Sequence, residues 1–204
     1  EVKAISNMSP FPNYPKKIKL LGQFLKRYII ADNIEELICF DQKLFLEKLL
    51  YIFYSNAVQK KEVITLSFNN PILIEFSSKE TETLKMYIED LILAGFSISH
   101  FGKNAFSIYS RPEILKEENV ENVIRKIISS LIFSKKRDVD EKIHRCIYYN
   151  VAANVGLNFE KELSIDEKNF LLAKWEELGN PFNSINNNPI FFKITKEEFE
   201  KKFK

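Results

Sequence analysis

Cysteine and histidine are scarce in this 204-residue chain, which has only two of each. The cysteines, Cys39 and Cys146, lie singly in apolar stretches, without the paired spacing of cysteine and histidine that holds zinc. We therefore expect both to be buried, reduced thiols. The histidines, His100 and His144, have no companion motif, and no Ser/His/Asp, P-loop or dinucleotide-binding spacing occurs. These absences argue against a zinc domain, a triad hydrolase and the common nucleotide-binding folds.

An excess of charge of one sign is also lacking. The chain has 30 Lys and Arg against 28 Asp and Glu, a formal net charge of +2 at pH 7. Because each neutralised phosphate needs a local cation, this balance argues against nucleic-acid binding through overall charge and leaves only a local basic patch. No apolar run reaches the length of about 18 residues that crosses a membrane, and no secretory signal is present. We therefore expect a cytoplasmic protein without a membrane partner.

Apolar residues are plentiful, at 45% of the chain, which is enough for one substantial core or two small ones. Residues 1–17 are different, because Pro10, Pro12 and Pro15 stand among Ser, Asn and Lys without an apolar period. This composition is typical of the end of a flexible linker. A linker that arrives at a domain predicts a longer parent protein with an N-terminal part.

The stretch 22–54 is the centre of the predicted domain. Two β-branched and aromatic runs, 28–31 and 37–40, predict a pair of strands joined by a short polar turn. From Lys43 onward, apolar residues cover more than one face of a predicted helix, which must therefore be buried on two sides. Asp41 stands between sheet and helix, where its carboxylate can cap the helix and interact with its dipole.

The rest of the chain alternates strand and helix patterns. Capping boxes begin at Ser164 and at Thr195, and Gly95 and Gly179 are predicted helix stops. The other predicted elements are strands at 63–66 and 72–76 with a turn or bulge at Asn69-Asn70-Pro71, a helix over 78–94, a hairpin of 96–100 with 105–109, helices from Asn119 to 132, over 139–155 and up to Leu178, and a last strand at 189–194.

Ordered landmarks in this pattern resemble the C-terminal domain of the MutL family of bacterial mismatch-repair proteins. The family has a Gly-Gln opening, a Tyr-Ile-Ile-Ala-like strand and an Asp-Gln-His-Ala-x-x-Glu motif that leads a helix. The corresponding residues here are Gly22-Gln23, Tyr28-Ile29-Ile30-Ala31 and Asp41-Gln42-Lys43-Leu44-Phe45-Leu46-Glu47. Further landmarks are Pro71, Gly95-Phe96, Phe101-Gly102, Pro112 and a closing Pro189-Ile190-Phe191-Phe192.

The resemblance implies an α+β fold in two parts. Residues 18–66 with 144–204 would form a dimerisation subdomain, and residues 67–143 an inserted regulatory subdomain. It also implies a homodimer that couples two N-terminal ATPase arms around DNA. The apolar excess of the helix and of the last strand is the physical reason to expect a symmetric partner there. The interface candidates are Leu44, Leu49, Phe53, Ile190, Phe191 and Phe192.

The resemblance fails at the metal ligands. Nuclease-competent members use the first motif, extended to a second Glu, and a Cys-Pro-His-Gly-Arg-Pro motif, whose side chains hold a metal that activates water. Here the first histidine is Lys43, the second glutamate is Ile52, and the second motif reads Ser-Ile-Asn-Asn-Asn-Pro over 184–189. Asp41, Gln42 and Glu47 remain as vestigial positions, too few to fix an ion. We therefore expect no metal, no cofactor and no catalysis in this domain, with ATP and Mg²⁺ used only by the N-terminal part.

Two other functions stay open at this point. One is a weak metal-dependent nicking endonuclease that uses Asp41, Glu47 and unrecognised ligands. The other is an accessory DNA-binding module. Its basic patch would consist of Lys16, Lys17, Lys19, Lys26 and Arg27.

The expected partners follow from the resemblance. They are a second copy of the chain, a mismatch sensor, a helicase and a sliding clamp, and the resemblance places the protein in the cytoplasm with the nucleoid. Clamp-binding members carry Gln-x-x-Leu-x-Pro, of which only Pro71 remains here. DNA would be bound weakly or through the full-length protein.

Overall fold

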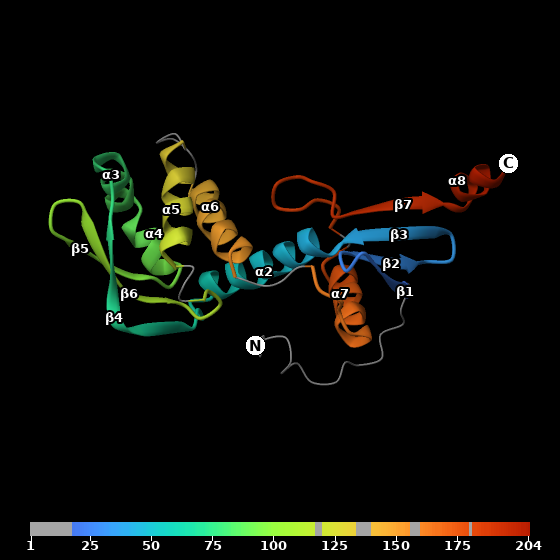
Figure 1. The fold of residues 1–204 in the computed structure, drawn as a ribbon, viewed down its shortest axis with the longest axis horizontal. Coiled ribbons are helices and arrows are strands. Elements are labelled where there is room, and N and C mark those ends of the chain that lie inside the picture. The colour runs from blue at the N-terminus through green and yellow to red at the C-terminus, as the bar shows by residue number, and fades with distance from the viewer. Residues whose placement is uncertain (1–17, 117–119, 134–139, 156–159, 180) are drawn as a thin grey trace. The chain divides into compact units, whose positions relative to one another are not determined.

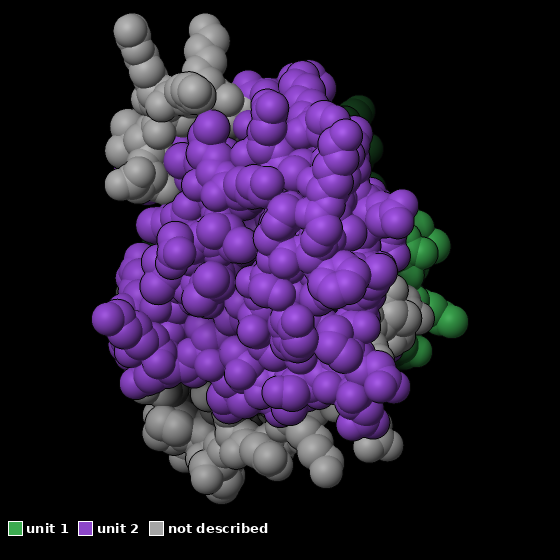
Figure 2. All heavy atoms as spheres, turned by 90° about the vertical axis from the view of Figure 1, so that its left-hand side faces the viewer, with its two compact units in different colours: residues 1–46, 159–204 green, residues 47–158 purple. Residues whose placement is uncertain are grey.

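The computed structural model describes residues 18–116, 120–133, 140–155, 160–179 and 181–204. The predicted linker 1–17, with Lys16 and Lys17, lies outside these residues, as does the predicted cap Asn119. The fold is α+β, as predicted, and divides into two compact units. Unit 1 comprises residues 1–46 and 159–204, and unit 2 comprises residues 47–158 (Figure 2).

Unit 1 is built on a four-stranded antiparallel sheet in the order β1-β2-β3-β7 (Figure 1). Strands β2 and β3 confirm the predicted pair, and β7 confirms the predicted last strand. The strand β1 was not predicted, because its glycine and a register shift between Leu20 and Gly22 interrupt the alternating pattern. The bounds are β1 Lys19–Phe24, β2 Tyr28–Asp32, β3 Glu36–Asp41 and β7 Phe191–Thr195.

One face of this sheet holds the core of unit 1. The strand register places Ile29, Ala31, Ile38 and Phe40 on this face, and all four are fully buried. Trp175 of α7 (Ile165–Glu177) contacts Phe40 edge-on, with ring centroids 5.0 Å apart. The rings of Phe45 and Phe191 lie 5.8 and 5.4 Å from that of Phe40 on the same face. Aromatic packing therefore covers this face of the sheet.

The helices of unit 1 begin where the capping boxes predict. Ser164 caps α7, Ile165–Glu177, and its hydroxyl accepts a hydrogen bond from the amide of Glu167. The carboxylate of Glu167 in turn accepts a hydrogen bond from the amide of Ser164. Thr195 and Glu198 repeat the arrangement at α8, Lys196–Glu200, which is followed by a 3₁₀ turn over Lys201–Phe203. Trp175 is a core residue, and its indole nitrogen donates to the carbonyl of Pro181. Local capping thus sets both helix starts.

Helix α2 runs over Gln42–Gln59, so it begins in unit 1 and its larger part belongs to unit 2. Tyr54 and Val58 of α2 lie in the core of unit 2, as do Ile143 and Ile147 of α6 (Asp140–Ala153). The predicted subdomain boundaries, after residue 66 and before residue 144, therefore differ from the observed divisions at 46/47 and 158/159. Helices α2 and α6 belong to unit 2 because their apolar faces pack in its core. The sequence pattern shows that these faces are apolar but not which core they join.

Unit 2 contains a three-stranded antiparallel sheet in the order β4-β6-β5, with bounds β4 Thr65–Glu75, β5 Ser97–Phe101 and β6 Ala105–Pro112. The predicted hairpin and its end at Pro112 are confirmed. Instead of two strands around Pro71, β4 is one strand with a bulge, since its register shifts between Ser67 and Ile72. Pro71 lies exposed in that bulge. Proline has no amide hydrogen to donate, and at a bulge this costs the sheet no hydrogen bond between strands.

Helices cover one face of the unit 2 sheet. The predicted helix over 78–94 divides at Tyr87 into two segments, and Gly95 ends it with φ +90°. Helix α5 buries the predicted face, which includes Val123, Ile127 and Leu131. The bounds are α3 Ser78–Met86, α4 Ile88–Leu93, α5 Val120–Ile132 and α6 Asp140–Ala153. Across the described ranges, none of the helices has the length and hydropathy needed to cross a bilayer.

Candidate functional site

Asp41 is held by hydrogen bonds on both of its carboxylate oxygens. Oδ1 accepts from the amides of Lys43 and Leu44, at 3.0 and 3.1 Å, which confirms Asp41 as the cap of α2. Oδ2 accepts from Nε and Nη2 of Arg27, at 3.2 and 2.9 Å. The hydrogen bond to Asp41 raises the pKa of the Arg27 guanidinium. The carboxylate thus fastens the helix start to the turn between β1 and β2.

Backbone bonds bring the two motif stretches together at this joint. The amide of Asp41 donates to the carbonyl of Ile190 at 2.8 Å, and the amide of Gln42 donates to the carbonyl of Arg27 at 2.9 Å. Residues 184–188 close a tight turn, in which the Ser184 amide donates to the carbonyl of Asn188. The segments that carry the two metal motifs in nuclease-competent members are therefore neighbours here, although about 140 residues separate them in sequence.

A hollow of about 190 Å³ opens beside Asp41. Its lining is mostly apolar, and the thiol of Cys39 lies in it together with the carboxylate of Asp41 and the hydroxyl-bearing ring of Tyr28. Burial, together with the charge of Asp41, raises the pKa of that thiol, so it stays protonated at neutral pH. The lining residues are Tyr28, Cys39, Asp41, Leu44, Pro189, Ile190, Phe191 and Phe192.

The residues at this site do not fit a divalent metal. Asp41 already uses both oxygens, and the aligned second motif supplies serine, asparagine and isoleucine where a metal would need thiolate and imidazole. In the part of the chain that the structure describes, no group of three His, Cys, Asp or Glu side chains is arranged to hold an ion. We therefore derive no catalytic step at this site.

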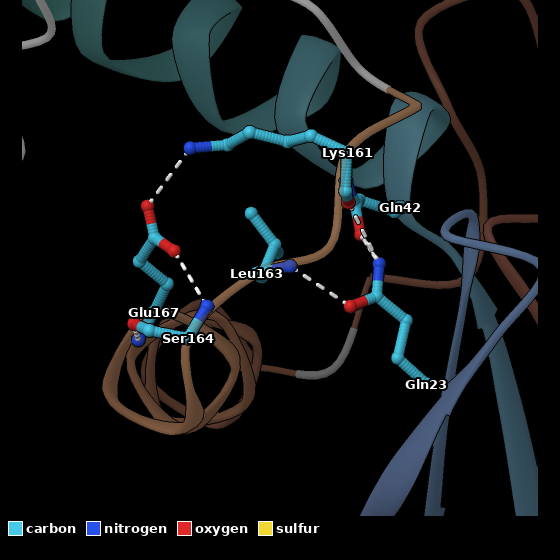
Figure 3. Close-up of polar contacts among 6 residues, drawn as sticks. All are labelled: Gln23, Gln42, Lys161, Leu163, Ser164 and Glu167. Carbon is cyan, nitrogen blue, oxygen red and sulfur yellow. Dashed lines mark hydrogen bonds and ion pairs between the residues drawn. The ribbon is translucent and has the colours of Figure 1, made fainter.

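Two glutamines form a clasp next to the same joint, and the sequence did not predict it (Figure 3). Gln23 Nε2 donates to Gln42 Oε1 at 2.6 Å and to the carbonyl of Lys161 at 2.9 Å, while its Oε1 accepts from the amide of Leu163. Gln42 is fully buried and also donates to the carbonyl of Lys161. The clasp ties β1 and the start of α2 to the chain that enters α7. Gln42 of the vestigial motif therefore has a structural contact.

The six dimer-interface candidates fall into two groups. Leu49, Ile190 and Phe191 are at most 7% exposed, so they belong to the core of the single chain and offer little surface to a partner. Phe53 and Phe192 are exposed at 48% and 55%, and Leu44 is half-buried at the hollow. The remaining vestigial residue, Glu47, is buried on α2. An interface role for the exposed candidates stays a prediction.

The three described members of the predicted basic patch do not form one cluster. Lys19 begins β1, whereas Lys26 and Arg27 lie in the turn after its far end, roughly 17 Å away at the rise of an extended strand. Arg27 is also paired with Asp41 and lies over the ring of Tyr28. The ion pair was missed because residues 14 positions apart meet only through the hairpin register. Lys16 and Lys17 lie outside the described residues.

The thiols differ from the expectation in one respect. Both cysteines are free, and Cys39 is buried as predicted, but Cys146 is only partly buried. Burial raises the pKa of the Cys146 thiol as well. Neither thiol is therefore poised as a nucleophile.

Comparison with known proteins supplies the family. Residues 21–153, from β1 to the end of α6, match the family described as MutL C terminal dimerisation domain. The chain belongs to this family. Among relatives named DNA mismatch repair protein MutL, that of Endomicrobium trichonymphae is 29% identical over 192 residues, 94% of this chain, and that of Clostridium tetani is 30% identical over 190 residues, 92% of this chain. The chain spans only 32% and 30% of the length of these two relatives.

Proposed function

We propose that this chain joins two copies of a DNA mismatch-repair protein and does not itself cut DNA. Membership of a dimerisation-domain family supports the first half of the proposal. The second half rests on one observation, the engagement of Asp41. Its two oxygens accept four hydrogen bonds, from Lys43, Leu44 and Arg27, and ligating a metal would require breaking the helix cap or the ion pair.

The proposal extends to the whole protein, since the relatives are about three times as long as this chain. In it, the remaining part carries an ATPase that uses ATP and Mg²⁺, and the dimer closes two such arms around DNA at the nucleoid. A mismatch sensor, a helicase and a sliding clamp dock on the assembly. The exposed Pro71 bulge of β4 is the remnant of a clamp-binding motif. DNA is held mainly by the full-length protein, because Lys19 lies away from Lys26 and Arg27 in the predicted patch and Arg27 is paired with Asp41.

Sedimentation equilibrium of the 204-residue chain, without added metal and from nanomolar to high micromolar concentration, tests the dimer. We expect twice the mass of one chain down to micromolar concentration or below. A mass of one chain throughout would overturn the dimerisation half of the proposal. The concentration series distinguishes a weak dimer from a stable one. By mass action, the mean mass of a weak dimer would fall gradually from two chains to one as the concentration is lowered.

Nicking of supercoiled plasmid DNA with Mn²⁺ or Zn²⁺ tests the second half. We expect no activity above background, and no difference between the wild type and Asp41→Asn. Nicking that this substitution abolishes would revive the endonuclease alternative. DNA binding by the isolated chain is measured in the same preparations. Steeply salt-dependent binding that is lost on Lys19→Glu with Lys26→Glu would instead favour the DNA-binding module.

A further inference from the structure

We infer that Arg125 and Pro71 block the free edge of strand β4 and so prevent it from pairing with a strand of another chain. β4 is an edge strand, because the sheet order of unit 2 is β4-β6-β5 and leaves one side of β4 without a strand. The unpaired edge of a sheet is a template on which further strands can add, so proteins with a long edge carry features that block it. The blocked edge belongs to unit 2 alone and is independent of the proposed dimer.

β4 is the edge of this sheet that most needs a block. It has 11 residues, whereas the other edge strand, β5, has five and carries a register shift after Ser97. Short and irregular edge strands pair poorly with new partners. After its bulge, β4 continues as Ile72-Leu73-Ile74-Glu75 and leads into Phe76, a window with strong strand propensity and a single charge. Windows of this composition are prone to aggregate when they are exposed at an edge.

The hydrogen-bond pattern shows which backbone groups of β4 face its free edge. The amide of Phe76 donates to the carbonyl of Asn104 at 2.9 Å, so the backbone groups of Phe76 point toward the β6 side. Because backbone groups alternate sides along an antiparallel strand, those of Leu73 and Glu75 point the other way, to the free edge. The next outward position in the same alternation is Pro71. An added strand would therefore bond at these three positions.

Arg125 of α5 occupies the last of the three positions. Its Nη2 donates to the carbonyl of Glu75 at 3.0 Å and so fills the acceptor that an added strand would use. The guanidinium is also fixed from two other directions. Its Nε donates to Oε1 of Glu121, one turn earlier on α5, at 2.9 Å, and its Cζ lies 5.1 Å from the centre of the Phe76 ring. These contacts hold the planar group over the edge of β4.

Pro71 removes the donor at the first of the three positions. Proline has no amide hydrogen, so a strand laid along the edge would lack one hydrogen bond there. It would lack a second one at the carbonyl of Glu75, which Arg125 already occupies. Before the bulge, only residues 65–67 pair with β6, fewer than the usual strand length of about five or six. Proline and arginine thus block both ends of the stretch on which a new strand could add.

The block limits the assemblies that the chain can form. Pairing through the edge of β4 would join single chains in pairs, and it would join two-fold dimers end to end into open chains. Each of the two missing hydrogen bonds is worth about fivefold in an equilibrium constant. Together the two groups therefore weaken pairing through this edge by about 25-fold.

Removal of both blocking groups tests this role. In the double variant Pro71→Thr with Arg125→Ala, threonine supplies the missing amide and a side chain that favours strands, and alanine uncovers the carbonyl of Glu75. We expect sedimentation velocity to show species larger than those of the wild type. The wild type is the reference, so this expectation is the same whether the wild type is a monomer or a dimer.

The matched control is Asn70→Thr with Lys126→Ala. It changes the neighbouring residue in the bulge and the neighbouring cation on α5, whose Nζ bonds Asn154 instead of the edge of β4. Both pairs of substitutions add one threonine and remove one positive charge, but only the first pair opens the edge. We expect the double variant to form the larger species at a concentration about 25-fold below any at which the control forms them.

A third substitution separates edge pairing from unfolding. Leu73, at the open position of the edge, is 52% exposed, so Leu73→Lys places a charge there. Lysine on an edge strand opposes pairing, and we expect its addition to the double variant to restore the species of the wild type. A double variant that sediments like the control at every concentration would overturn the inference. Larger species that persist with Leu73→Lys would also overturn it, because they would not form through this edge. A monomeric wild type would instead refute the proposed dimer and leave the blocked edge standing.

Discussion

Replacing Asp41 separates its role as a helix cap from its charge. Alanine removes the acceptor for the amides of Lys43 and Leu44, and loss of an Asp cap costs about 1 kcal/mol. Asparagine caps helices about as well as aspartate, so Asp41→Asn keeps the stabilisation from the helix cap. It loses only the negative charge that faces Arg27. We therefore expect stability to fall in the order wild type, Asp41→Asn, Asp41→Ala.

Urea unfolding followed by tryptophan fluorescence measures this order in the relevant unit. The chain has a single tryptophan, Trp175, which is buried against Phe40 and Phe191 in unit 1. Its emission therefore reports on the unit that contains Asp41. With a slope of about 2 kcal/mol per molar urea, loss of the cap moves the midpoint by about 0.5 M. An Arg27→Met background provides the control, because the difference between Asp41 and Asp41→Asn should vanish there.

Two results would refute the reasoning. If Asp41→Ala unfolds at the wild-type midpoint, the cap contributes nothing to stability. If Asp41→Asn is as unstable as Asp41→Ala in both backgrounds, the carboxylate acts through an interaction other than the cap and the Arg27 pair.

Two further predictions concern unit 2. Gly95→Ala should destabilise the chain by about 2–4 kcal/mol in urea unfolding followed by circular dichroism, because the φ of Gly95 is +90° and an added Cβ would lie 2.7 Å from the side chain of Val63. Gly102 has a φ of +77° but open space around it, so the control Gly102→Ala should cost only about 1–2 kcal/mol. A larger loss of stability for Gly102→Ala than for Gly95→Ala would contradict the packing argument. NMR titration should find the pKa of Glu80 below its ordinary value of 4.5, since the amide and hydroxyl of Ser77 bond its carboxylate. Because the pKa of Glu80 is lower in the folded state, its contribution to the stability of α3 is fully present above pH 4.5 and is lost as the pH falls through the lowered pKa. Ser77→Ala should return the pKa of Glu80 toward 4.5.

Local elements could be predicted from the sequence because their signals are local. The capping boxes at Ser164 and Thr195, the apolar face of α5 and the hairpin around Gly102 depend on residues within a few positions of one another. The aspartate cap of α2 was predicted for the same reason. Misses occurred where a strand pattern was interrupted, as at Gly22 in β1, or where a proline was accommodated by a bulge, as at Pro71.

The candidate site depended on contacts that sequence patterns do not encode. The meeting of Asp41 with Ile190, the Arg27 pair and the glutamine clasp with Lys161 and Leu163 all join residues from separate strands or helices. Each requires the register of the sheet and the return of the chain from unit 2. The motif resemblance predicted that metal ligands are missing, but it did not predict the ion pair of Asp41 with Arg27.

The sequence by itself determined the capped starts of α2, α7 and α8, most strands, the α+β class and the family landmarks, because these follow from periodicity and from side chains that bond their own backbone. Only the tertiary structure decided which apolar residues are core and which are surface. Ile190 and Phe191 are buried while their neighbour Phe192 is exposed, although all three are equally apolar. The reason is that burial depends on the face to which a strand turns each residue and on what packs there.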